Sequence, residues 1–157
     1  MNSHHWITIG ALLGALGVAL GAFGAHGLEE RLERRLLSGE GATALESGDG
    51  EAETALSIDE ELARGLDNYE TAVRYHMYHA LALVLVGLLA AHTTSRAIHV
   101  AGWAFLLGIA LFSGLLYVLV FTGVKVLGAL VPIGGTLLIA GWIAMAIAAA
   151  SSKATRP

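Results

Sequence analysis

The sequence predicts an all-α integral membrane protein, a four-helix bundle with a long acidic loop between its first and second helices. All thirteen acidic residues lie between Glu29 and Glu70, so no carboxylate side chain occurs on either side of that segment. Hydrophobic residues make up 55% of the 157 residues and charged residues only 14%, whereas soluble domains carry about 25% charged residues. A soluble protein scatters its acidic residues because each surface helix needs a polar face. This distribution therefore indicates a chain that lies mostly in lipid.

Four apolar segments are each long enough to cross the hydrocarbon core of a bilayer, which takes about 20 helical residues. They cover residues 6–25, 74–92, 98–121 and 126–150, and residues 28–68 form the acidic loop. The links between the last three segments are very short, so these helices must be antiparallel neighbours. The chain is thus expected to be a single membrane domain in the plasma membrane, with the lipid bilayer as its main partner.

The first apolar segment has a second interpretation as a cleaved signal peptide. Ala22, Gly24 and Ala25 are small residues of the kind found at cleavage sites. However, no lysine or arginine precedes the segment, and it is longer than the usual apolar region of a signal peptide. The sequence therefore favours a retained span, and cleavage would leave three.

Glycines recur along the first segment at intervals of four and three residues, which places them on one helix face. Close backbone approach holds helices together in lipid, where no hydrophobic driving force acts between them. Tight packing within the bundle is the favoured interpretation, and a seam between copies of the chain, or with another membrane protein, is the alternative. The glycines are Gly10, Gly14, Gly17, Gly21 and Gly24.

The acidic segment has three parts. Leu28 to Leu37 is expected to form a short amphipathic helix on the membrane surface. Residues 39–54 show no apolar periodicity and are expected to be mobile and removable without unfolding the bundle. Ser57 and Glu60 form a capping box that predicts a helix start near Ile58. A solvated insertion is favoured over a partner-binding segment.

The fourth span contains a proline followed closely by two glycines, Pro132, Gly134 and Gly135. Proline removes a backbone donor and clashes with the preceding turn, so the helix is expected to kink or open there. Such breaks also build binding sites in transporters. A transporter is not favoured, because no acidic residue lies inside a span to couple to ions.

Three histidines stand at the loop side of the first two spans. His26 closes the first span, and His76 and His79 open the second, where Tyr75 shares a helical stripe with His79. Imidazoles inside an apolar helix are costly unless they have partners. We expect His26 and His79 to lie within contact reach. Hydrogen bonding is the favoured role, and contact with a lipid headgroup or quinone, or ligation of a metal or haem, are the alternatives.

Several function classes lack their sequence signatures. The chain has no cysteine, which excludes disulfides, thiolate metal sites, thioether-linked haem and a cysteine nucleophile. The sequence contains no basic patch of the kind that binds nucleic acid. No zinc-protease motif, phosphate-binding glycine loop or catalytic triad spacing is present. The sequence therefore predicts no enzyme and requires no cofactor, and it leaves the question of a metal open.

Four segments, taken in order, resemble a known family. They are residues 21–28, Glu70 with residues 75–83, residues 112–117, and residues 132–135 with Gly141 and Trp142. They are similar to the YgdD-like small membrane proteins (domain of unknown function 423), which include eukaryotic transmembrane protein 256. The resemblance implies a compact four-helix membrane protein and supplies no activity, cofactor or substrate. It places His26, Tyr75, His79, Ser113 and Pro132 at family motif positions. The acidic insertion, roughly residues 33–58, departs from the family.

The sequence thus favours a structural or accessory membrane protein over one that binds haem, metal or quinone at His26 and His79. The orientation evidence conflicts. The short segments on the terminal side carry Arg96, Lys153 and Arg156, against Lys125 on the other side. The long loop adds arginines that count the other way, but long segments cross the membrane largely regardless of charge. We therefore expect cytoplasmic termini and an external acidic loop.

Overall fold

The structure, a computed structural model, describes residues 2–38, 51–93 and 95–151, and for residues 51–57 the backbone alone. The described residues are almost entirely helical and contain no strand. Four helical stretches are long and apolar enough to cross a membrane: Ser3–Ser38, Ile58–Ala90, Arg96–Thr122 and Lys125–Ser151. The predicted all-α membrane bundle is confirmed.

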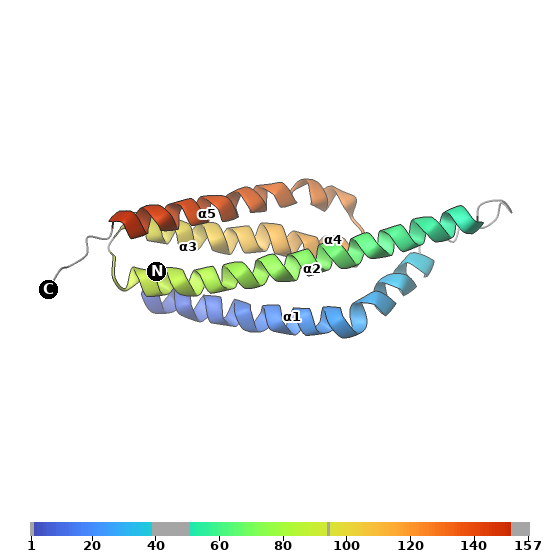
Figure 1. Cartoon of the computed structure of the whole chain (residues 1–157), viewed down its shortest axis with the longest axis horizontal. Coiled ribbons are helices and arrows are strands. Elements are labelled where there is room, and N and C mark those ends of the chain that lie inside the picture. Colours follow the sequence, from blue (N-terminus) through green and yellow to red (C-terminus); the bar gives the residue numbers. More distant parts are fainter. Residues whose placement is uncertain (1, 39–50, 94, 152–157) are drawn as a thin grey trace.

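Five α-helices make up these stretches: α1 (Ser3–Ser38), α2 (Glu51–Ala90), α3 (Arg96–Ile109), α4 (Leu115–Thr122) and α5 (Val131–Ser151). They run side by side, with α2 between α1 and α3, and α5 on the far side of α3 (Figure 1). The start of α1 and the end of α5 lie at the same end of the bundle (Figure 1). At the opposite end, α1 and α2 extend beyond the other helices (Figure 1).

The glycine stripe of α1 is the contact surface for α2. A Cβ atom on Gly10 would meet the Ala80 carbonyl oxygen at 2.8 Å and the Val84 nitrogen at 2.9 Å, so the two backbones touch there. Side chains of α2 fill the positions opposite Gly17, Gly21 and Gly24. Gly14, by contrast, has no atom within 4 Å of its Cβ position. Four of the five glycines therefore pack inside the bundle.

Two hydrophobic clusters form the core. The larger one surrounds Trp6, Phe105 and Leu83, which are fully buried where α1, α2, α3 and α5 meet. The smaller one joins Leu28 and Leu32 of α1 to Tyr69 of α2 and Val120 of α4. The leucine stripe of residues 28–37 was expected to lie on the membrane surface, and this expectation is wrong. The stripe packs on protein instead, because an apolar helix face is buried equally well by a neighbouring helix.

The second helix extends further into the acidic segment than predicted. Helix α1 continues to Ser38, and α2 begins at Glu51 rather than near Ile58. Residues 51–56 are mostly glutamate, alanine and leucine, which are strong helix formers, so helix propensity outweighs the capping signal at Ser57. Much of the predicted loop, residues 28–68, is therefore helical. The predicted mobility and removability of residues 39–54 concern mainly residues 39–50, which lie outside the described part of the chain.

Two spans contain irregular turns. A π-helical turn, η2 (Ala110–Gly114), separates α3 from α4, and a 3₁₀ turn, η3 (Lys125–Ala129), precedes α5. The fourth span was expected to kink or open at Pro132, Gly134 and Gly135, but α5 is a continuous helix over these residues and the irregular turn precedes it. Pro132 stands in the first turn of α5, where its missing N–H costs nothing. Nothing in the sequence analysis predicted the π turn. Gly134 packs directly on the backbone of this π turn, so a Cβ atom at residue 134 would clash with Leu111 and Phe112.

Candidate functional site

The two histidines of α2 are buried inside the bundle. His76 is 2% exposed and His79 is 5% exposed. They occupy adjacent positions in a stripe of buried residues spaced three and four apart along α2, namely Tyr69, Ala72, His76, His79, Leu83 and Val86. This spacing puts all six on the face that α2 turns toward its neighbours. Imidazoles in such positions need polar partners.

Both ring nitrogens of His79 have partners. Nδ1 donates its hydrogen to the Tyr75 carbonyl oxygen at 2.7 Å, one turn earlier in α2. The indole Nε1–H of Trp142 donates to Nε2 at 3.3 Å, which links α2 to α5. These bonds require the neutral tautomer with hydrogen on Nδ1. The rings of Phe105 and Trp142 pack around the imidazole at centroid distances of 5.6 and 6.2 Å.

His76 is only half satisfied. Its Nδ1 and the Tyr117 hydroxyl of α4 form a hydrogen bond of 3.3 Å. The Leu13 carbonyl of α1 lies near the ring, but Nε2 makes no hydrogen bond. The buried hydroxyl of Ser113, one turn before Tyr117 in η2, also has no partner. Unpaired buried polar atoms of this kind are uncommon, and π turns often occur at functional sites.

A second tyrosine extends the polar contacts to α1. The Tyr69 hydroxyl donates to the Leu20 carbonyl oxygen at 2.8 Å. Its ring packs on that of Tyr117, with a centroid distance of 5.3 Å. Tyr69, His76 and His79 thus link α2 by hydrogen bonds to α1, α4 and α5, respectively. The sequence analysis missed Tyr69, Tyr117 and Trp142 as partners, although Tyr69 precedes His76 by two helical turns in the same stripe.

Tyr75, one turn before His79, lies at the exposed edge of the same stripe. Its side chain is 40% exposed and lies beside the Phe112 ring, 4.6 Å away between centroids. Its ring also stacks on that of His79 at 5.9 Å. The hydrogen bond between these two residues uses the Tyr75 carbonyl, so the tyrosine hydroxyl takes no part in it.

His26 does not join the α2 histidines. It is exposed on α1 and lines an open surface groove of about 460 Å³ with neighbouring glutamates and Leu66 of α2. Leu66 precedes His79 by 13 residues, which is about 20 Å along an α-helix. The expected contact between His26 and His79 is therefore wrong. It assumed that α1 ends at residue 25, whereas α1 continues and pairs with α2 over another three turns.

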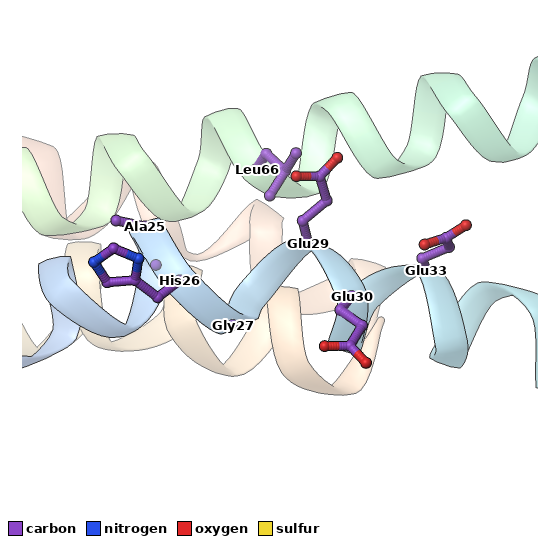
Figure 2. Close-up of a pocket in the computed structure, with 8 residues that line it drawn as sticks. Ala25, His26, Gly27, Glu29, Glu30, Glu33 and Leu66 are labelled. Atoms are coloured by element: carbon purple, nitrogen blue, oxygen red, sulfur yellow. The ribbon is translucent and has the colours of Figure 1, made fainter.

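The side chains around His26 diverge. Figure 2 shows Glu29 pointing toward α2 beside Leu66, while Glu30 points to the opposite side of α1 and His26 lies a turn away. Within the described residues, no group of three histidine, cysteine or acidic side chains is placed to hold a metal ion. The groove is therefore an open surface feature and not a metal site formed by described residues.

Comparison with known proteins identifies the family. A family model described as a protein of unknown function, DUF423, matches residues 20–135. The chain belongs to the DUF423 family. The resemblance noted in the sequence is thereby confirmed. Among DUF423 relatives, a UPF0382 membrane protein of Staphylococcus haemolyticus is 38% identical over 142 residues, covering 90% of this chain and 92% of the relative.

Other relatives carry the same description. A UPF0382 membrane protein of Staphylococcus aureus is 39% identical over 143 residues, covering 91% of this chain and 93% of the relative. The Bacillus subtilis UPF0382 membrane protein YwdK is 37% identical over 145 residues, covering 92% and 94%. No solved structure matches the chain. This DUF423 member is thus a small multi-pass membrane protein of unknown biochemical function, as the sequence predicted.

Proposed function

We propose that the protein is a non-catalytic structural component of the membrane, whose interior polar side chains hold its helices in register. The observation that supports this role most directly is the state of His79. Both of its nitrogens are occupied by protein groups, so neither is free to ligate a metal or a haem iron. A hydrogen bond of this kind fixes the position of α2 against α5, because an apolar interface alone does not specify helix rotation.

A double-mutant cycle on His79 and Trp142 tests this role. We expect Trp142→Phe and His79→Leu each to lower the free energy of unfolding in detergent, with a coupling energy of about 0.5–1.5 kcal/mol, the usual range for hydrogen bonds between membrane helices. Trp103→Phe is the matched control, because Trp103 lies on α3 and packs edge-on against Trp6 rather than His79. Its coupling to His79→Leu should be near zero.

A spectrum of the same samples separates the structural role from a cofactor-binding one. We expect the purified wild-type protein to show no visible absorption band and no stoichiometric metal. A band or a bound metal that disappears in His79→Leu would overturn the proposed function, whatever the stability cycle shows.

We also infer that both termini face the cytoplasm. The start of α1 and the end of α5 lie at the same end of the bundle (Figure 1). With the long acidic segment set aside, the short segments on that side carry Arg96, Lys153 and Arg156 against Lys125 on the other side, which favours this orientation by the positive-inside rule. A reporter that is active only in the cytoplasm, fused after Pro157, should therefore be active. A stably expressed but inactive fusion would place the acidic end of the bundle in the cytoplasm.

A further inference from the structure

Three cationic side chains line one pocket at the end of the bundle away from the termini. The pocket has a volume of about 660 Å³ and lies between the last turns of α1, the first half of α2 and the end of α4. Among the described lining residues, the cations are Arg35, Arg64 and Lys125, and the one carboxylate is that of Glu61. An excess of cations is unusual in this part of the molecule, because residues 29–70 contain every acidic residue in the chain.

The ion pairs leave an excess of positive charge among the described residues that line the pocket. Lys125 Nζ and Glu61 Oε1 lie 3.1 Å apart and form an exposed salt bridge. Neither Arg35 nor Arg64 forms an ion pair with a described residue. Two guanidinium groups therefore remain without a counter-charge among the described lining residues, and guanidinium groups bind phosphate through paired hydrogen bonds.

The end of α4 fixes Arg35 in the pocket wall. Its Nη1–H donates to the Val120 carbonyl oxygen at 2.6 Å, one of the carbonyls that a helix leaves unpaired in its last turn. Gly123 follows with φ of 72°, and its Cβ position is 3.4 Å from the Arg35 guanidinium. A side chain at residue 123 would crowd Arg35 and strain the backbone. The guanidinium is thus held in place before any ligand arrives.

The pocket lies at the level where the third span ends and the fourth begins, which is where the headgroups of a surrounding bilayer are expected. The span formed by α3 and α4 ends at Thr122, and Lys125 begins the next span after a short turn. Leu36, Leu119 and Ile58 contribute apolar side chains to the same walls. A ligand that fills the pocket would meet cations and apolar surface together, and a phospholipid offers a phosphate joined to acyl chains.

We propose that this pocket binds the phosphate of an anionic phospholipid, with Arg64 and Arg35 at the phosphate and the lipid chains along the apolar wall. Free phosphate has the same charge chemistry but leaves the apolar wall unused. Near a bilayer surface that is rich in anionic lipid, each lysine or arginine contributes about 1 kcal/mol to the attraction, and we expect the same scale to hold in this pocket. The proposal goes beyond the structural role proposed above and does not depend on it.

Lipid titration of the purified full-length protein tests the site. Phosphatidylglycerol, phosphatidylcholine and inorganic phosphate are each titrated in detergent while the thermal midpoint is measured, which gives a half-saturating concentration. We expect phosphatidylglycerol to raise the midpoint and Arg64→Gln to weaken its binding about fivefold, the equivalent of one cation. Arg34→Gln is the matched control, because Arg34 is exposed on α1, pairs with Glu30 and lies outside the pocket.

The possible results decide the proposal. A fivefold loss in Arg64→Gln with none in Arg34→Gln supports it. Equal stabilisation by phosphatidylcholine or by inorganic phosphate would overturn the assignment to an anionic lipid, and equal losses in the two arginine variants would overturn the pocket. If Arg64→Gln lowers the lipid-free midpoint, Lys125→Gln takes its place, because it leaves the Glu61 carboxylate unpaired in the pocket and should likewise weaken the binding of an anionic lipid. Arg35 is unsuitable as a probe because its removal also uncaps α4.

Discussion

Replacing Gly134 with alanine is expected to lower the free energy of unfolding by about 3 kcal/mol, the upper end of the range for overpacked interiors. The added methyl group would clash with the backbone atoms of Leu111 and Phe112 in the π turn. A flexible side chain can rotate away from a new methyl group, but a backbone cannot. Helix α5 would therefore have to separate from η2 along its first turns.

The neighbouring glycine provides the control. A Cβ on Gly135 would lie 3.6 Å from the Phe112 ring, an ordinary van der Waals contact. Gly135→Ala should therefore be neutral or stabilising by up to about 1 kcal/mol, since alanine favours the helix more than glycine does. Thermal unfolding in detergent, followed by loss of helical circular dichroism, measures both variants. Similar changes in the two would show that α5 does not pack on the π turn as described.

The sequence alone determines much of the fold because its main signals are local. Hydropathy locates the four spans, and the third, predicted at residues 98–121, is Arg96–Thr122 in the structure. The glycine spacing in α1 predicts a close helix contact, and α2 supplies it. These features depend on residues within a few turns of one another, which a single sequence shows directly.

The wrong contact between His26 and His79 comes from the register between helices. His26 and His79 each stand near a predicted span end, and the sequence suggests that the two ends lie together. Their true separation depends on how far α1 continues past the membrane and where it meets α2. The contacts of Leu28 and Leu32 with α2 and α4 set that register, and no local pattern states which helix a leucine stripe will meet.

The partners of the buried histidines are hidden for a similar reason. The sequence shows that His76 and His79 need polar partners, because they interrupt an apolar span. Trp142 and Tyr117 lie on other helices, and only the packing of α2 against α4 and α5 brings them into hydrogen-bonding range. The π turn at Ser113 likewise has no sequence signal of its own. The residue types thus predict that the histidines need hydrogen-bond partners, and the packing of the helices decides which residues those partners are.

Gly10→Ala is expected to destabilise the protein by about 2 kcal/mol through the contact between α1 and α2. The new methyl group would lie 2.8 Å from the Ala80 carbonyl oxygen and 2.9 Å from the Val84 nitrogen, both in the backbone of α2. Helix α1 packs mainly on α2, so few other contacts can hold it while the pair moves apart. Close packing is what keeps such helices together in lipid.

Two other glycines of the same stripe give a graded series. A Cβ on Gly17 would meet only the side chains of Met77 and His76, and the nearest atom is the flexible Met77 thioether, so Gly17→Ala should cost less than Gly10→Ala. Gly14 has open space at its Cβ position, so Gly14→Ala should be neutral or slightly stabilising. The unfolding midpoint in detergent should therefore be highest for Gly14→Ala, intermediate for Gly17→Ala and lowest for Gly10→Ala. If Gly14→Ala were the most damaging change, the stripe would instead be an interface between copies of the chain, because only an outside partner could meet a side chain at that position.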